Sequence, residues 1–244
     1  MAKKLNVPNI YFGSNRTCQE KDFWILPRFD KETERVLSFV LSPSKVDLAG
    51  ALKASRAELP QLTGRYWTVL LGGNCKGCSW TDHDWRMMTK QIIEEAIKAD
   101  VKLLVTSSPR TGAHAENICK NLLDQSGVLV KGIWFTKRHV ETNPSLLALL
   151  GAGERVIVTE DSATMVNEAV LAGKPVVTIS PFKIELLKKQ EDMLTRLHTK
   201  KHIYRLNRGD YSFSNIPNNE WNLVSCDWHS TFGRQLKRKI EQYG

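Results

Sequence analysis

The residues with the clearest chemical potential lie in the segment 155–183, RVIVTEDSATMVNEAVLAGKPVVTISPFK. Its order of apolar run, polar turn, apolar-periodic stretch and second apolar run predicts a strand, a helix and a parallel strand. The helix would begin beside Asp161 and Ser162, with Met165 in its first turn. The unpaired backbone N–H groups at the helix N-terminus would attract an anion. Glu168 follows Ser162 by just under two helical turns, near enough to hold a ribose while the helix start holds phosphate. The pattern also fits an ordinary capped helix.

A glycine turn follows an earlier apolar run, YWTVLL, and precedes a helical pattern. Gly72, Gly73 and Asn74 would let the backbone come close to a ligand, or would form a tight turn beneath a helix. Lys76 adds a cation to the same loop. The loop does not complete a P-loop, because Cys78 stands where lysine is needed, and it lacks the second glycine of GxGxxG.

A third polar turn, Ser107 to Thr111, closes the next apolar run and opens another helix. The guanidinium of Arg110 could donate two hydrogen bonds to a diphosphate. Ser108, Thr111 and nearby backbone N–H groups could donate further hydrogen bonds. The alternative is a surface arginine beside a helix cap.

Cys75 and Cys78 form a CxxC directly after a strand, a placement typical of thioredoxin-like redox motifs. With His83 they could also suggest a metal site. No second CxxC or HxxxH pairs with this one to complete four ligands, so we expect no metal site. We also expect no redox activity and no cofactor, and attribute the CxxC spacing to chance. His83, His114 and His139 are expected at the surface. Five cysteines without a secretion signal favour reduced thiols, and the other three are scattered: Cys18, Cys119 and Cys226.

These turns need a scaffold that brings them to one edge. Strand starts at residues 66, 102, 128, 155 and 175, alternating with helices, predict a doubly wound, mostly parallel α/β sheet of Rossmann-like type over residues 64–210. Thr81 and Asp84 predict a capping box on a helix over 81–99. Residues 1–63 predict three short strands and one helix over 46–59, a partial α/β subdomain. Residues 211–244 predict a loop and a basic closing helix over 231–242.

Composition indicates a soluble globular chain of 244 residues, with 41% hydrophobic and 25% charged residues. No uncharged run approaches 18 residues and no signal peptide is visible, which predicts a cytoplasmic location. The net charge of +9 includes a late cluster, Arg234 to Lys239. This cluster fits a solvated helix face, an attraction to anionic lipid, or nucleic acid. The aromatics do not alternate with basic residues, which argues against nucleic acid.

Four motifs together resemble the mitochondrial fission (elongated mitochondria) family of predicted glycosyltransferases, over about residues 7–210. They are GGNCKGCSW, VTSSPRTG, the Asn143-Pro144 pair and VTEDSATMVNEAVLAGKPV. The resemblance implies the GT-B architecture, in which two Rossmann-like domains face each other and the C-terminal one holds a nucleotide-sugar. The last motif is similar to the donor site of GT-B enzymes that make peptidoglycan lipid precursors. There, a glutamate six residues after a serine binds the nucleotide's ribose.

Carried onto this sequence, the resemblance implies that Ser162 and its neighbours meet the diphosphate and Glu168 meets the ribose. Arg110 and Lys76 would stabilise the leaving group, and the glycine turn would line the approach between domains. Residues 1–63 would be the remnant of an acceptor-side domain. The family commonly has serine at position 75 and a basic residue at position 109. These differences and the short N-terminal part fit a truncated or degenerate member of the family. From the resemblance we expect metal-free transfer of a sugar from a nucleotide-diphosphate donor. The alternative is a non-catalytic interaction protein on the same scaffold at a membrane surface.

Overall fold

The computed structural model describes residues 9–12, 22–26, 36–137, 143–213, 216, 220–225 and 227–243. The chain forms two compact units, one from Val46–Val224 and the other from Met1–Lys45 with Ser225–Gly244. Cys18, Cys226 and His139 lie outside the described residues.

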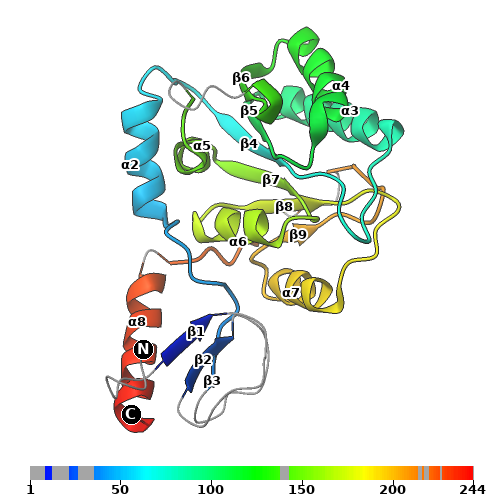
Figure 1. The fold of residues 1–244 in the computed structure, drawn as a ribbon. Coiled ribbons are helices and arrows are strands. Elements are labelled where there is room, and N and C mark those ends of the chain that lie inside the picture. Colours follow the sequence, from blue (N-terminus) through cyan, green and yellow to red (C-terminus); the bar gives the residue numbers. More distant parts are fainter. Residues whose placement is uncertain are drawn as a thin grey trace. The chain divides into compact units, whose positions relative to one another are not determined.

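The larger unit is built on a six-stranded parallel sheet with the order β6-β5-β4-β7-β8-β9 (Figure 1). Its strands are β4 (Tyr66–Leu71), β5 (Lys102–Ser107), β6 (Leu129–Ile133), β7 (Arg155–Thr159), β8 (Val176–Ile179) and β9 (Tyr204–Arg205). In chain order this is 3-2-1-4-5-6, the order of the dinucleotide-binding doubly wound fold. The predicted fold class is confirmed.

Helices cover both faces of this sheet (Figure 1). The first face carries α3 (Asp82–Lys98) and α4 (Gly112–Ser126), and the second carries α5 (Leu146–Ala152) and α6 (Ala163–Leu171), with α2 (Leu48–Glu58) packed on α5. The remaining elements are the 3-10 turn η1 (Phe135–Lys137) and α7 (Lys188–Thr199). The predicted capping box of α3 is present, with Thr81 and Asp84 each bonding the other's backbone N–H.

Alternate residues of the strands point to opposite cores, as the pleat requires. Trp67, Val69 and Leu71 of β4 join the cluster beneath α3 and α4, which also takes in Tyr211 and Phe213. Tyr66 of the same strand joins Leu104, Ile133 and the α5 residues on the other side. Because β4 is buried on both faces at every position, its sequence reads as a continuous apolar run.

The smaller unit contains a three-stranded parallel sheet, β1 (Asn9–Phe12), β2 (Asp22–Leu26) and β3 (Val36–Ser38), and the helix α8 (Trp228–Tyr243). Phe39 packs against two aromatic rings of α8, those of Phe232 at 4.3 Å and Trp228 at 6.3 Å between centroids. The Lys239 ammonium donates to the Val36 carbonyl at 2.9 Å. The three short strands expected in residues 1–63 and the closing helix are therefore present.

The helix expected over 46–59 groups with the larger unit, because α2 packs extensively on α5. The compact units thus divide at residues 45/46 and 224/225. The origin of residues 1–63 as an acceptor-domain remnant stays a prediction. Within the described residues, no helix combines the length and the apolar character needed to cross a membrane.

Candidate functional site

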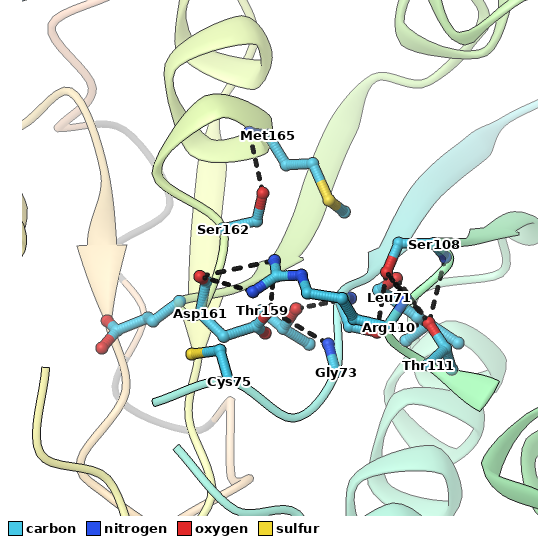
Figure 2. Close-up of polar contacts among 12 residues, drawn as sticks. Leu71, Gly73, Cys75, Ser108, Arg110, Thr111, Thr159, Asp161, Ser162 and Met165 are labelled. Carbon is cyan, nitrogen blue, oxygen red and sulfur yellow. Dashed lines mark hydrogen bonds and ion pairs between the residues drawn. The ribbon is translucent and has the colours of Figure 1, made fainter. Parts of the chain in front are cut away.

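The loops that follow β4, β5 and β7 meet where the strand order reverses. β4 pairs with β5 on one side and with β7 on the other. In doubly wound sheets this switch point, at the carboxyl ends of the strands, is the usual place for a ligand. The three polar turns that the sequence predicts lie close together at this point (Figure 2).

The glycine turn after β4 is held by β7 and its loop. The Gly72 N–H donates to Thr159 Oγ1 at 2.7 Å, and the Gly73 N–H donates to Asp161 Oδ2 at 2.9 Å. A Cβ on Gly72 would lie 2.1 Å from the Asp161 carboxylate, and one on Gly73 would lie 2.0 Å from the Arg110 carbonyl oxygen. Close packing against the loops after β7 and β5 therefore leaves no room for a side chain at either glycine. Their part in a ligand's approach stays a prediction.

Asp161 and Arg110 form an ion pair across the switch point. A guanidinium nitrogen of Arg110 lies 2.8 Å from Asp161 Oδ2, and the same group also reaches the Asp161 carbonyl oxygen at 3.4 and 3.5 Å. The Asp161 carboxylate is fully buried, whereas the Arg110 side chain is 38% exposed. Burial raises the pKa of Asp161, although hydrogen bonds from Thr159 and Gly73 and the charge of Arg110 act in the opposite direction.

Arg110 thus extends from the loop after β5 to the start of α6 (Figure 2). Its pairing with Asp161 uses part of its five-donor fork, because a guanidinium carries more N–H groups than one carboxylate oxygen and one carbonyl can accept. More than a third of the side chain stays exposed to solvent. The buried Asp161 carboxylate holds both Arg110 and Gly73 in position.

The hydroxyls of Ser108 and Thr111 turn inward to the glycine turn. Ser108 Oγ donates to the Gly72 carbonyl at 3.1 Å, and Thr111 Oγ1 donates to the carbonyls of Leu71, at 3.0 Å, and Gly72. Thr111 is buried, has helical backbone angles and makes no side-chain cap to α4. Both hydroxyls therefore tie the β5 loop to β4, a role that the sequence pattern did not predict.

Ser162 is the N-cap of α6, as predicted. Its hydroxyl accepts from the Met165 N–H at 3.4 Å, and its backbone is extended, as an N-cap requires. Met165 and Glu168 are half-buried on the first and second turns. The helix dipole and the first N–H groups of α6 therefore point out of the same edge that Arg110 reaches.

Asn74, Lys76 and the two cysteines continue the glycine turn. Asn74 Oδ1 accepts from the Trp80 N–H at 2.7 Å and so closes the loop that leads to α3. Lys76 is exposed at the tip of the turn between Cys75 and Cys78. No group of three or more His, Cys, Asp or Glu side chains within the described part of the chain could hold a metal ion.

One buried network beside the site was not predicted. Arg205 of β9 donates to both Glu160 oxygens, at 2.8 and 2.9 Å, and to Glu191 of α7 at 2.7 and 3.2 Å. Glu160 is 1% exposed and also accepts from Thr178 at 2.6 Å. In the sequence, Glu160 is the first residue of the polar turn EDS and is easily mistaken for a solvent-facing residue. It turns into the protein and fixes the end of β7.

Comparison with known proteins gave three results. A search of curated proteins found no match. Among solved structures, the chain is similar to the E. coli heptosyltransferase WaaC with ADP-2-deoxy-2-fluoro heptose, with 13% identity and a TM-score of 0.37. That match covers 75% of this chain and 47% of the heptosyltransferase chain. The family model described as Mitochondrial fission ELM1 matches residues 15–226. On that match, which spans most of the sequence, the chain belongs to the Mitochondrial fission ELM1 family.

Proposed function

We propose that the Val46–Val224 unit binds a nucleotide-diphosphate sugar at the start of α6, as the donor site of a metal-free GT-B-type glycosyltransferase. The observation that carries the proposal is the convergence of Arg110 and the α6 N-terminus at the switch point of the sheet. A cationic side chain and a helix N-terminus there would both be directed at an anion. Glu168, on the next turn of α6, would hold the ribose.

The chemistry that these groups would support is stabilisation of the leaving group. As the sugar's anomeric carbon loses the nucleotide diphosphate, negative charge grows on the phosphate oxygens. Because Asp161 already balances the charge of Arg110, the Arg110 side chain would act mainly by donating hydrogen bonds to the phosphate oxygens. The α6 dipole and the exposed Lys76 would supply the positive field.

Glu168 provides the sharpest test of the site. Replacing it with alanine should remove hydrogen bonds to the ribose, at a cost of about 1.5 to 3 kcal/mol, which weakens binding roughly tenfold to a hundredfold. Calorimetric titration with uridine and guanosine diphosphates, and with their sugar conjugates, measures this. Glu94→Ala, which removes an exposed carboxylate from α3, should bind as the parent does. Equal affinity of the parent and Glu168→Ala for the nucleotide that binds best would contradict the assignment.

A second candidate function, association with an anionic membrane surface, is favoured by α8. Its side chains Arg234, Lys237 and Arg238 are exposed, and each basic residue near such a surface contributes about 1 kcal/mol. We expect the full chain to sediment with phosphatidylserine vesicles at low salt, and the variant with all three replaced by glutamine to stay in solution. Replacing Lys188, Lys189 and Lys200, also exposed, changes net charge equally and is the control. If both variants lose binding equally, net charge is responsible and α8 has no special role.

A further inference from the structure

Cys75 and Cys78 face each other across a two-residue turn. The Cys75 N–H donates to the Cys78 carbonyl and the Cys78 N–H donates to the Cys75 carbonyl, both at 3.0 Å. Residues that exchange both backbone bonds lie directly opposite, with Cα atoms about 5.5 Å apart. This spacing falls within the range of roughly 4.4 to 6.8 Å found across disulfides. The backbone is therefore already at the separation that a disulfide needs.

Contacts with the loop after β8 hold this turn in place. The Gly77 carbonyl accepts from the Glu185 N–H at 2.5 Å, and the Ser79 N–H donates to the Lys183 carbonyl at 3.2 Å. Gly77 has a φ of +82°, and a Cβ there would lie 2.0 Å from the Glu185 carbonyl oxygen. Two hydrogen bonds to the segment 183–185 thus fix the turn, and disulfide formation requires side-chain rotation and not a new backbone arrangement.

The two thiols differ in access. Cys75 is half-buried and Cys78 is 1% exposed. Burial, with the nearby Asp161 carboxylate, raises the pKa of the Cys78 thiol to about 12. Cys119, the third thiol that the structure describes, is fully buried against Thr89, and burial raises its pKa to about 11. An external reagent therefore reaches Cys75 first.

We propose that Cys75 and Cys78 form a reversible oxidation site, a dithiol that a low-molecular-weight disulfide such as glutathione disulfide converts to an intramolecular disulfide. The Cys75 thiolate attacks one sulfur of glutathione disulfide, forming a mixed disulfide and releasing one glutathione thiolate. The Cys78 sulfur, giving its proton to the released thiolate or to water, then attacks the Cys75 sulfur and releases the second glutathione. Two electrons and two protons leave the protein, and one disulfide becomes two thiols. The site requires no nucleotide.

The test equilibrates the folded full chain with glutathione disulfide, alkylates the remaining thiols and maps the peptides by mass spectrometry. The parent should show Cys75 joined to Cys78. Cys78→Ser should accumulate glutathione on Cys75, because the resolving thiol is gone, whereas Cys75→Ser should leave Cys78 as a thiol. Cys119→Ser should behave as the parent. Circular dichroism establishes that each variant is folded.

The same equilibration in urea shows whether disulfide formation depends on the fixed turn or only on exposure of the two thiols. If the turn pre-arranges the two residues, the folded chain should form the disulfide at least about tenfold more favourably than the unfolded chain. Full alkylation of both cysteines in the oxidised, folded parent would overturn the proposal. So would equal disulfide formation in folded and unfolded protein, or glutathione on Cys78 and not on Cys75.

Discussion

Asp161 shows how a single side chain at the switch point can be structural and still shape a ligand site. Its buried carboxylate accepts from the Gly73 N–H and pairs with Arg110, so three loops depend on one group. The carboxylate is fully buried. Its influence on an anion would pass through Arg110, whose position it fixes.

Replacing Asp161 with alanine should therefore destabilise the larger unit. The change leaves the buried Gly73 N–H without an acceptor and Arg110 without its counterion, which should lower the free energy of unfolding by about 2 to 3 kcal/mol. Urea denaturation measures the loss. Asp82→Ala removes a carboxylate from the exposed pair with His114 and should cost no more than about 0.5 kcal/mol. Comparable losses in the two variants would refute the structural role of Asp161.

Asp84 should make stability depend on acid. Burial favours its neutral form, but hydrogen bonds from Thr81, Tyr211 and Phe182 outweigh burial and lower the pKa of Asp84. A group whose folded pKa is lowered contributes stability that is complete above its unfolded pKa, about 3.9. That contribution is lost as the pH falls through the folded pKa.

Thermal unfolding of the parent and of Asp84→Asn, followed between pH 6 and pH 2, tests this. The gap in midpoint between the two proteins should narrow as the solution becomes more acidic, because only the parent loses a charge-assisted contact. Asp124→Asn, which alters an exposed i,i+4 pair, should show little gap at any pH. A gap for Asp84→Asn that stays constant down to pH 2 would contradict the lowered pKa.

At this scale the sequence predicted which residues meet but not which way they point. The role of Ser162 as an N-cap and the position of Arg110 near the start of α6 follow from residue type and spacing. Ser108, Thr111 and Asp161 are equally suited to a ligand or to a neighbouring backbone, because both offer hydrogen-bond partners. In the structure all three side chains bond to backbone groups of the protein, and their part in binding a ligand stays a prediction.

Among the elements, α6 depends on a cap that can be tested without disturbing its neighbours. Ser162→Ala should lower the unfolding free energy by about 1 kcal/mol, since the Met165 N–H loses its acceptor. Ser162→Gly should cost only a few tenths of a kcal/mol, because glycine is accepted at an N-cap. Chemical denaturation of both variants measures the difference. A negligible loss in Ser162→Ala would mean that the 3.4 Å contact contributes nothing.

The elements were the most predictable level of this structure. The expected strand starts at 66, 102, 128, 155 and 175 compare with observed starts at 66, 102, 129, 155 and 176. Long apolar runs bounded by glycine or polar turns are strong signals. β9 was missed because two residues, Tyr204 and Arg205, are too few for any period, and their place is set by pairing with β8 and by the bonds of Arg205.

For the molecule as a whole, the Arg205 network joins the last strand to the middle of the sheet. Arg205→Met should leave the buried Glu160 carboxylate without its counterion and cost about 3 to 5 kcal/mol. Adding Glu160→Gln should recover part of that loss, because the amide carries no charge. Differential scanning calorimetry of the single and double variants tests this. A double variant less stable than the single one would contradict it.

The pairing of β4 with β7 has a consequence for the order of folding. Gly73 and Asp161, whose contact closes the switch point, are 88 residues apart in the chain. As the chain leaves the ribosome, β4, β5 and β6 can assemble first, while the other edge of β4 stays open until β7 emerges. Nascent chains halted before residue 155 should therefore expose that edge to chaperones and proteases, and the switch point should be among the last parts to gain protection.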